Sequence, residues 1–241
     1  MKNYFYRIIT GEKKGFLPAI LKTFLFILSL FYTIILEMIK LFYRQRRRRL
    51  AAKVISVGNI TWGGAGKTPL VEYIAGYLKE NGYRPAVLSR GYKRKDKYAP
   101  RVIYNGKNLD ASGLEIKELG DEAYLLAEKL KDIPLGVFPD RIRCAKIIEE
   151  KFHPDTFILD DGFQHWKLFR DLDIVAIDAT CPFGDGFIIP CGVLREPKSA
   201  LRRADIFVIT KTNVNPDTRD LKSALNKINP AALIVESVYE I

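Results

Sequence analysis

The most constraining feature of this sequence is an apolar run followed by a glycine-rich turn and a helix-like stretch. The run is Val54–Val57, the turn contains Gly63 and Gly64, and Gly66 directly precedes the helical stretch. A strand, a cradle of backbone N–H groups and a helix N-terminus in this order are typical of a phosphate-binding loop. We therefore predict an α/β fold, with a P-loop NTPase-like, mostly parallel sheet flanked by helices, whose first loop binds a nucleotide.

Two side chains of this loop carry its chemistry. The Lys67 ammonium is expected to neutralise phosphate oxygens, and the Thr68 hydroxyl is expected to bind Mg²⁺. Thr61 stands where the usual pattern has a glycine, so an ordinary glycine-rich turn is the alternative interpretation. The residues expected to contact the nucleotide are Gly63, Gly64, Ala65, Gly66, Lys67, Thr68 and Pro69.

The positive charge of the chain is concentrated near its N-terminus. The 241 residues contain 39 Lys and Arg against 28 Asp and Glu, a net charge of +11, of which residues 1–50 carry +9. A nucleic-acid-binding groove would instead spread basic residues over the folded domain, with aromatic side chains among them. We therefore expect no nucleic-acid partner.

The three cysteines are far apart, which favours a reducing compartment.

The N-terminal segment, residues 1–50, contains a long apolar and aromatic stretch. Its uncharged core, Thr23–Leu36, would extend about 21 Å as a helix, less than the ~30 Å thickness of the hydrocarbon layer. Lys22 and Lys40 could lengthen the usable span by snorkelling. The arginines Arg46–Arg49 favour binding to an anionic cytoplasmic leaflet, which predicts that the following domain lies on the cytoplasmic side. We predict a membrane-associated helix, spanning or interfacial; a core helix of a soluble protein is the alternative.

The remaining residues, 51–241, are predicted to form one domain in which apolar runs alternate with helical stretches. Strands separated by helices indicate a parallel sheet covered on both faces, and Tyr104–Lys107 is typical of a hairpin inserted in it. The predicted strands are Val54–Val57, Ala86–Ser89, Leu135–Phe138, Phe157–Asp160, Ile174–Asp178, Ile206–Thr210 and Ala232–Val235. The predicted helices are Pro69–Glu80, Asp121–Lys131, Arg141–Lys151 and Arg219–Lys227.

Acidic residues stand where the carboxyl ends of strands are predicted, which is where ligands bind in such sheets. Asp160 and Asp161 follow an apolar strand, so they are candidates for holding Mg²⁺ opposite Thr68, with a turn or helix-cap acid as the alternative. Asp178 is a second candidate with weaker support. Asp121 opens a predicted helix, a position that the helix dipole also favours.

Taken together, these stretches resemble the tetraacyldisaccharide 4′-kinase family of lipid A biosynthesis along nearly the whole chain. The apolar N-terminal helix and its basic flank are part of the resemblance. The motifs that carry it are Val57-Gly58-Asn59 leading into Gly63 to Pro69 as one, then Leu88-Ser89-Arg90-Gly91-Tyr92, Gly120-Asp121-Glu122, Asp160-Asp161-Gly162-Phe163-Gln164-His165, Pro182 to Gly186 and Gly192 to Pro197. Six motifs in the family's order make the resemblance specific.

The resemblance implies transfer of the γ-phosphoryl group of ATP to the 4′-hydroxyl of an acylated glucosamine disaccharide 1-phosphate, the membrane-held precursor of lipid A. It implies that Lys67 neutralises the β- and γ-phosphates and that Asp121 accepts the proton of the sugar hydroxyl. Arg195 would offset charge on the transferring group or bind the substrate phosphate. The implied Mg²⁺ ligands are Thr68, Asp160, Asp161 and Glu196.

The family resemblance also bears on where the enzyme is located and on how much of the family's length this chain covers. The enzyme would be attached through its N-terminal helix to the cytoplasmic face of the bacterial inner membrane, an anionic surface. The family continues past the equivalent of Ile241 into a portion with an Asp-His motif, so this chain is expected to be a fragment or a shortened relative. Its oligomeric state and acyl-chain preference do not follow from the sequence.

The main rival is a membrane-associated P-loop ATPase or GTPase switch that acts on a protein partner. Such switches often have a lysine directly before the Gly-Gly-x-Gly-Lys stretch, where this chain has Trp62. The Asn-Lys-x-Asp motif that recognises guanine is also missing from the sequence, and Thr210–Asn213 resembles it only weakly. Both departures favour the kinase.

Overall fold

In the computed structural model, the chain forms two compact units, and each unit is made of separate segments of the sequence. The described residues are 15–92, 94, 98–108 and 119–238. The first unit, here the terminal unit, is Met1–Arg46, Asn59–Ala65 and Val175–Ile241; the second, the central unit, is Arg47–Gly58 and Gly66–Ile174. Residues 1–14 of the predicted N-terminal segment lie outside the described residues, and its boundary at residue 50 stays a prediction.

The central unit contains a sheet with β6 between β1 and β2. Its strands are β1 (Lys53–Gly58), β2 (Pro85–Ser89), β3 (Arg101–Tyr104), β4 (Lys107–Asn108), β5 (Leu135–Val137) and β6 (Thr156–Asp160). They lie in the order β4-β3-β5-β2-β6-β1. The pairs β1–β6, β2–β6 and β2–β5 are parallel, whereas β3 is antiparallel to both β5 and β4. The hairpin predicted at Tyr104–Lys107 is confirmed, with Asn105 and Gly106 both at positive φ.

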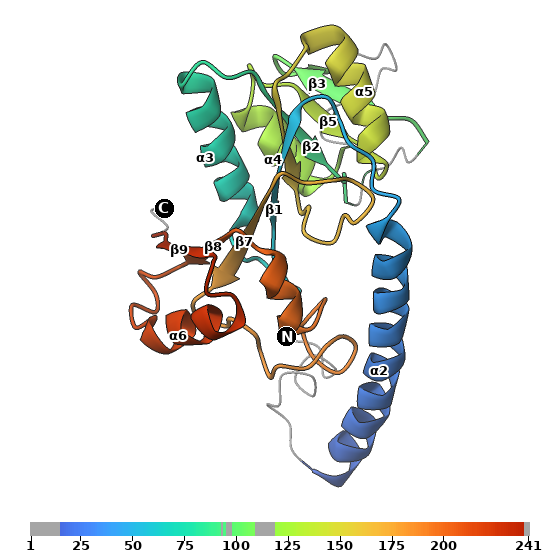
Figure 1. Ribbon diagram of the computed structural model, residues 1–241, viewed down its shortest axis with the longest axis vertical. Helices are drawn as coiled ribbons and strands as arrows, with labels where there is room; N and C mark the ends of the chain where they lie inside the picture. Colours follow the sequence, from blue (N-terminus) through green and yellow to red (C-terminus); the bar gives the residue numbers. More distant parts are fainter. Residues whose placement is uncertain (1–14, 93, 95–97, 109–118, 239–241) are drawn as a thin grey trace. The chain divides into compact units, whose positions relative to one another are not determined.

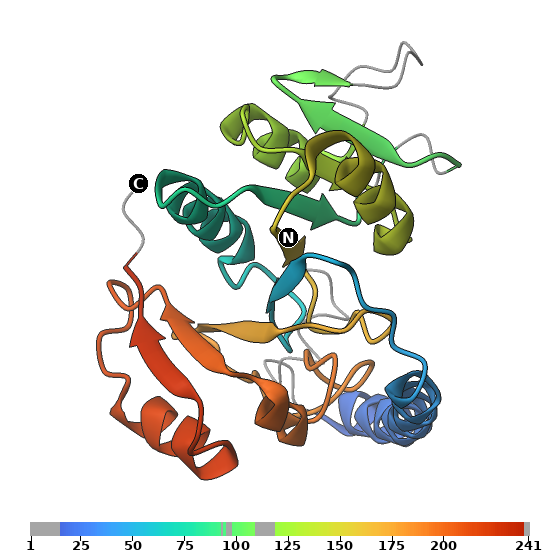
Figure 2. The same cartoon turned by 45° about the horizontal axis from the view of Figure 1, so that its top comes forward.

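Helices cover both faces of this sheet. They are α3 (Lys67–Glu80), α4 (Asp121–Lys129) and α5 (Arg141–Phe152). Side chains of α5 pack with Phe157 and Leu159 of β6 in one apolar cluster, and Figure 2 shows α5 beside β3 and β5. Because side chains alternate along a strand, Ile158 and Asp160 face the opposite side. That side is covered by α3, which contacts β1, β2 and β6.

A tight turn after β6 packs against the end of β1. Asp161 has a φ of +53°, and the Gly162 N–H donates to the Val57 carbonyl at 3.0 Å. The following residue, Phe163, is fully buried. A Cβ placed on Gly58 would lie 2.5 Å from the Phe163 Cβ and 2.7 Å from the Phe163 backbone nitrogen. Only glycine at position 58 therefore allows the turn to sit where it does.

The terminal unit combines the N-terminal helix with the C-terminal strands. Its elements are α2 (Phe16–Arg44), the end of β7 (Leu172–Asp178), the 3-10 helix η2 (Lys198–Arg203), β8 (Ile206–Thr210), α6 (Arg219–Ile228) and β9 (Leu233–Glu236). The strands lie in the order β7-β8-β9, and β8 and β9 are parallel. The central residues of β8 are buried.

Helix α2 is one continuous element of 29 residues, drawn in blue in Figure 1. At about 1.5 Å per residue it is roughly 44 Å long. Within the described ranges it is the one helix long and apolar enough to cross a membrane, and only 17% of its most apolar window is buried. Exposure on this scale argues against the alternative of a soluble core helix, whose apolar residues would be covered.

Contacts inside the terminal unit hold α2 against the segment before η2. Lys22 forms an ion pair with Asp185 at 3.0 Å, and Phe26 packs edge-on against Phe187 with ring centroids 6.0 Å apart. Further along the helix, the Tyr32 hydroxyl donates to the Arg195 carbonyl at 3.3 Å. The helix is therefore fixed to the chain on one side, while most of its apolar side chains remain exposed.

The sequence predicted the described elements closely. All seven predicted strands are present, and Ile206–Thr210 has the bounds predicted for it. All four predicted helices are present; α4 ends at Lys129, two residues early, because Leu130 already has a non-helical φ and ψ. The 3-10 helix η2 was not predicted.

Replacing Gly58 with alanine should destabilise the central unit by about 2 kcal/mol, the usual cost of overpacking a rigid site. The added methyl group would meet backbone as well as side-chain atoms of Phe163. Thermal and denaturant unfolding would measure the change. Gly76→Ala is the matched control, because a Cβ there meets nothing within 4 Å and alanine favours the helix. Equal stabilities of the two variants would contradict the packing argument.

Candidate nucleotide-binding site

The predicted site residues fall in both units. Those of the central unit are Gly66, Lys67, Thr68, Pro69, Asp121, Asp160 and Asp161. Those of the terminal unit are Gly63, Gly64, Ala65, Arg195 and Glu196.

In the central unit, the start of α3 directs Lys67 toward the acidic end of β6. Gly66 caps the helix with a φ of +75°, a conformation that glycine adopts without strain. Lys67 and Thr68 are therefore the first two helical residues, and Pro69 is tolerated because it stands in the first turn. The Lys67 ammonium lies 3.5 Å from the Asp161 carboxylate. The loop lysine and one of the two strand-end acids are therefore neighbours, whereas the metal role predicted for the acids stays a prediction.

Asp160 is a buried carboxylate with a perturbed pKa. Its pKa is raised to about 6, mainly by burial and also by the nearby charges of Asp161 and Glu122. A hydrogen bond of 3.0 Å from the Ser89 hydroxyl and the charge of Lys67 act in the opposite direction. The carboxylate is thus short of positive charge, which is the environment that a bound cation would relieve.

Arg141 is a member of this cluster that sequence reasoning missed as a site residue. It is 5% exposed, and its guanidinium donates to the Pro139 carbonyl at 3.1 Å. Burial and the charge of Arg90 lower its pKa to about 10, while Asp160 and Asp161 act to raise it. Arginine is over-represented where proteins bind carboxylates and phosphates. Its only signal in the sequence is its position directly after a predicted strand and turn.

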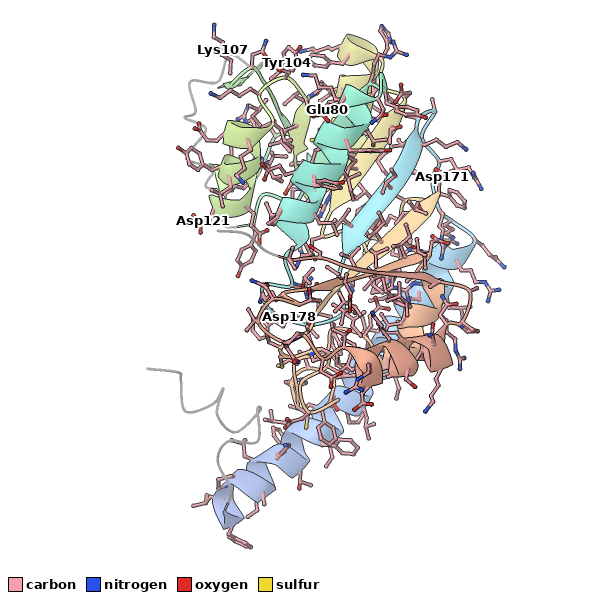
Figure 3. The ribbon with its side chains drawn as sticks, turned by 90° about the vertical axis from the view of Figure 1, so that its left-hand side faces the viewer. Glu80, Tyr104, Lys107, Asp121, Asp171 and Asp178 are labelled. Atoms are coloured by element: carbon pink, nitrogen blue, oxygen red, sulfur yellow. The ribbon has the colours of Figure 1, made fainter. Side chains whose placement is uncertain are left out.

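Asp121 is the first residue of α4 and is exposed. Figure 3 shows it at the end of that helix. Its place is set by Gly120, which has a φ of +93° and on which a Cβ would lie 2.0 Å from the Tyr92 carbonyl oxygen. The two motifs that contain these residues therefore meet in the structure. The neighbouring Glu122 is close enough for its charge to act on Asp160.

His165 follows the turn that carries the two acids. Burial is the largest cause that lowers its pKa, to about 3, and the charges of Arg141 and Arg170 add to it. Its Nε2 atom is buried and makes no hydrogen bond to the described residues. The ring is therefore neutral over the physiological range.

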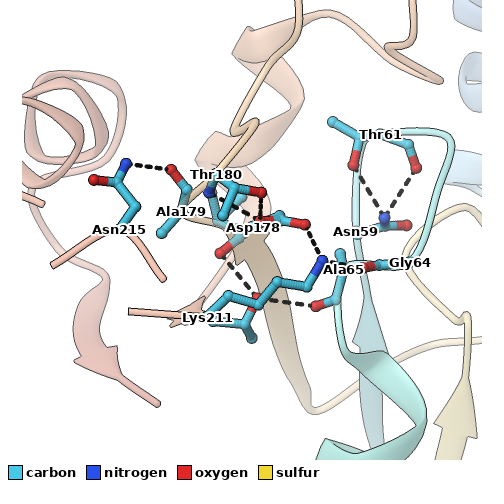
Figure 4. A network of polar contacts seen from close by, with 11 residues as sticks. Asn59, Thr61, Gly64, Ala65, Asp178, Ala179, Thr180, Lys211 and Asn215 are labelled. Atoms are coloured by element: carbon cyan, nitrogen blue, oxygen red, sulfur yellow. Dashed lines mark hydrogen bonds and ion pairs between the residues drawn. The ribbon is translucent and has the colours of Figure 1, made fainter. Parts of the chain in front are cut away.

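In the terminal unit, residues of the β8 end hold the first part of the loop. The Lys211 ammonium donates to the Gly64 carbonyl at 3.0 Å and forms an ion pair with Asp178 (Figure 4). The Thr210 hydroxyl shares its proton between the Ala65 carbonyl, at 3.2 Å, and the Ile177 carbonyl, at 3.3 Å. Asp178, the weaker of the predicted metal candidates, is thus bound by a lysine.

Arg195 and Glu196 lie in the same unit, before η2. The Arg195 N–H donates to the Ile60 carbonyl at 2.7 Å, which joins this segment to the residues leading into the loop. Glu196 is fully buried, and both of its carboxylate oxygens accept hydrogen bonds from Arg203, at 2.9 and 3.0 Å. Lys40 of α2 lies 3.4 Å from the same carboxylate. The predicted metal role of Glu196 stays a prediction.

A magnesium ion would have to be bound mainly by oxygen atoms of the acids and of the nucleotide itself. Among the residues that the structure describes, no group of three or more His, Cys, Asp or Glu side chains gathers at metal-binding distance. Magnesium often uses one or two carboxylates together with phosphate oxygens and water. The adjacent pair Asp160 and Asp161, with the charge deficit at Asp160, fits that kind of site.

The fold and the loop define a P-loop NTPase-like α/β protein. The chain belongs to the tetraacyldisaccharide-1-P 4′-kinase family, whose sequence profile matches residues 21–237. It is 38% identical to the tetraacyldisaccharide 4′-kinase of Halothermothrix orenii, over 98% of this chain and 62% of that protein. It is 45% identical to that of Syntrophus aciditrophicus, over 74% of this chain and 51% of the relative.

A solved structure agrees with this assignment. The crystal structure of LpxK from Aquifex aeolicus in complex with ATP matches with a TM-score of 0.72 and 38% identity, over 81% of this chain and 61% of that one. The chain therefore spans about half to three fifths of the length of these relatives. The family resemblance and the fold class expected from the sequence are confirmed.

The buried His165 should make the free energy of unfolding depend on pH. Because the folded-state pKa of His165 lies near 3 and its ordinary pKa is 6.5, the group favours the folded state above pH 6.5. This contribution is lost as the pH falls from 6.5 toward 3, by about 3 kcal/mol at pH 4.5. We expect denaturant unfolding to show a smaller loss between pH 8 and pH 4.5 for His165→Gln than for the unmodified chain.

The only other histidine in the sequence supplies the control. His153 is exposed and has a φ of +47°, so His153→Asn preserves its left-handed conformation. This variant should follow the pH dependence of the unmodified chain. If His165→Gln does so too, His165 is not the buried neutral group described above.

Proposed function

We propose that the chain transfers the γ-phosphoryl group of ATP to the 4′-hydroxyl of an acylated glucosamine disaccharide 1-phosphate, the precursor of lipid A. The observation that carries this proposal is membership of the 4′-kinase family over residues 21–237, with the loop lysine and the strand-end acids in place. The relatives are named tetraacyldisaccharide 4′-kinases, and the relative from Aquifex aeolicus was crystallised with ATP.

In this proposal the loop and the acids bind the nucleotide and its metal. Lys67 neutralises the β- and γ-phosphates, and Thr68, Asp160 and Asp161 hold Mg²⁺. The ion supplies positive charge that stabilises the transferring phosphoryl group. Asp161 already lies 3.5 Å from Lys67, so nucleotide and metal would share the charges of this pair. Phosphoryl transfer needs positioned charge more than covalent chemistry.

Asp121 is the proposed general base. Its exposure at the first residue of α4 leaves the carboxylate accessible to a sugar hydroxyl. Arg195 would bind the substrate's phosphate or offset charge on the transferred group. Glu196, whose oxygens both accept hydrogen bonds from Arg203, is the remaining proposed metal ligand.

Labelled phosphate should pass from γ-labelled ATP to the acylated disaccharide when the purified chain, Mg²⁺ and detergent-solubilised lipid are combined. Chromatography of the lipid product and its sensitivity to a 4′-specific phosphatase would identify the site of transfer. Hydrolysis of ATP that is independent of the lipid, with no labelled lipid, would contradict the kinase and favour a switch ATPase.

The same assay separates the base from the nucleotide site. Asp121→Asn should lower kcat at least about 100-fold, the lower range for loss of a general base, with an unchanged dissociation constant for ATP. Glu128→Gln is the matched control, because Glu128 is exposed near the other end of the same helix. Equal rates for the two variants would remove Asp121 from the mechanism.

We also propose that α2 attaches the chain to the cytoplasmic face of the bacterial inner membrane, where the lipid substrate resides. The apolar residues that α2 exposes include Phe24 at 57%, Phe31 at 60% and Ile35 at 54%. The exposed arginines Arg46–Arg49 follow the helix and would contact anionic headgroups. Arg46 stacks on Phe42 at 4.2 Å, which places one basic group beside the apolar helix.

Flotation with vesicles of anionic phospholipid tests this attachment. The triple variant Phe24→Ser, Phe31→Ser and Ile35→Ser should lower the partition coefficient at least about tenfold, because each side chain contributes roughly 1.5–3 kcal/mol when buried in lipid. The control removes exposed aromatic residues from another helix, Tyr73→Ser with Tyr77→Ser on α3. Undiminished flotation of the triple variant would contradict attachment through α2.

A further inference from the structure

Lys211 lies at the end of β8 in a backbone conformation that lysine seldom adopts. Its φ is +58°, in the left-handed region where residues other than glycine are uncommon. A lysine has no short polar side chain to stabilise this conformation locally, as asparagine and aspartate do. Tertiary contacts must therefore favour it, and such positions often accompany functional sites.

The contacts of its ammonium group explain the conformation. Lys211 Nζ donates to the Gly64 carbonyl at 3.0 Å and to a carboxylate oxygen of Asp178, as Figure 4 shows. Asp178 is fixed in turn by Thr180, whose N–H donates at 2.9 Å and whose hydroxyl donates at 2.6 Å. Burial would raise the pKa of Asp178, but these hydrogen bonds outweigh it and the pKa is lowered. The carboxylate therefore stays charged and holds the lysine in place.

The loop depends on such polar contacts because little side-chain packing supports it. Gly63 and Gly64 are exposed, and a Cβ on either would meet nothing within 4 Å. The next residue, Ala65, is buried, and its carbonyl accepts from the Thr210 hydroxyl. Two consecutive loop carbonyls are thus bound by two consecutive residues at the end of β8.

Holding a carbonyl also orients an N–H group. A peptide group is planar and trans, so the carbonyl of one residue points opposite to the N–H of the next. Fixing the Gly64 carbonyl therefore directs the Ala65 N–H to the other side of the loop backbone. Phosphate-binding loops bind anions through such N–H groups. The Ala65 N–H donates to the Gly63 carbonyl at 3.2 Å, and a bound phosphate oxygen would take the place of that carbonyl.

We propose that Lys211, held by Asp178, is a positioning residue that orients the Gly64–Ala65 peptide group for phosphate binding. The inference rests on the proposed function insofar as it takes this loop to bind a nucleoside triphosphate. Lys211 contacts the loop from its carbonyl side, so it acts through the backbone and not on the phosphates. The loss of the Lys211 ammonium therefore weakens nucleotide binding even though this group does not contact the phosphates.

Titration calorimetry of Mg²⁺–ATP against the full chain tests the inference. Lys211→Met keeps the length of the side chain and removes its donors, and it should weaken ATP binding about tenfold. The matched control is Lys222→Met, because Lys222 forms an exposed ion pair with Glu236 at 2.8 Å in the same unit. This control should bind ATP with the affinity of the unmodified chain.

Further variants distinguish positioning from a loss of folding. Thr210→Val removes the hydroxyl that binds the Ala65 carbonyl and should weaken ATP binding severalfold, which tests the same device if Lys211→Met fails to fold. Asp178→Asn should also weaken binding, and its effect should be less than additive with Lys211→Met, because both act through one ammonium group. The melting temperature without nucleotide should change little, whereas the stabilisation given by a fixed ATP concentration should fall.

The outcomes separate the inference from the proposed function. ATP affinity that is unchanged in both Lys211→Met and Thr210→Val overturns the positioning role and leaves nucleotide binding intact. Fully additive effects of Asp178→Asn and Lys211→Met also contradict it, because the two residues would then act independently. A lack of ATP binding by the unmodified chain contradicts the proposed function, and the inference with it.

Discussion

The close approach of the turn after β6 to the end of β1 is the constraint on which the central part of the site depends. The backbone of Phe163 occupies the space that a Cβ on Gly58 would need. This approach sets the position of Asp161, one residue before Gly162 in the turn, and Asp161 lies within 3.5 Å of Lys67. A glycine at the end of one strand thus determines where the acids of another strand stand relative to the loop lysine.

The acids themselves carry an electrostatic cost that is consistent with cation binding. Asp160 is buried with one hydroxyl donor, and neighbouring carboxylates add negative charge. Arg141 and Lys67 offset only part of this, since the pKa of Asp160 remains raised. Buried groups with perturbed pKa values are concentrated at functional sites because their stabilisation is left for a ligand to complete.

The terminal unit shows a different use of charge. Arg203 and Lys40 bind Glu196, and Lys211 binds Asp178, so each of these acids has its cation within the unit. The partly exposed pair Lys211–Asp178 contributes little net stability but fixes geometry, whereas removing a partner of the fully buried Glu196 would leave an uncompensated charge. Here they fix the segment next to α2 and the carbonyl side of the nucleotide loop.

Sequence alone determined the class of fold, the loop and most elements, because apolar periodicity and glycine spacing are local properties that strands and helices express directly. It also singled out Asp160 and Asp161 as acids at a strand end opposite the loop, since the carboxyl ends of parallel strands meet at one edge of a sheet. It did not find Arg141 or the contacts of Lys211 with Gly64 and Asp178, and it left Asp178 as a possible metal ligand. Those assignments depend on which side chains meet across strands that are distant in sequence. Only tertiary structure decides this, because burial and charge partners are set by packing and not by residue type.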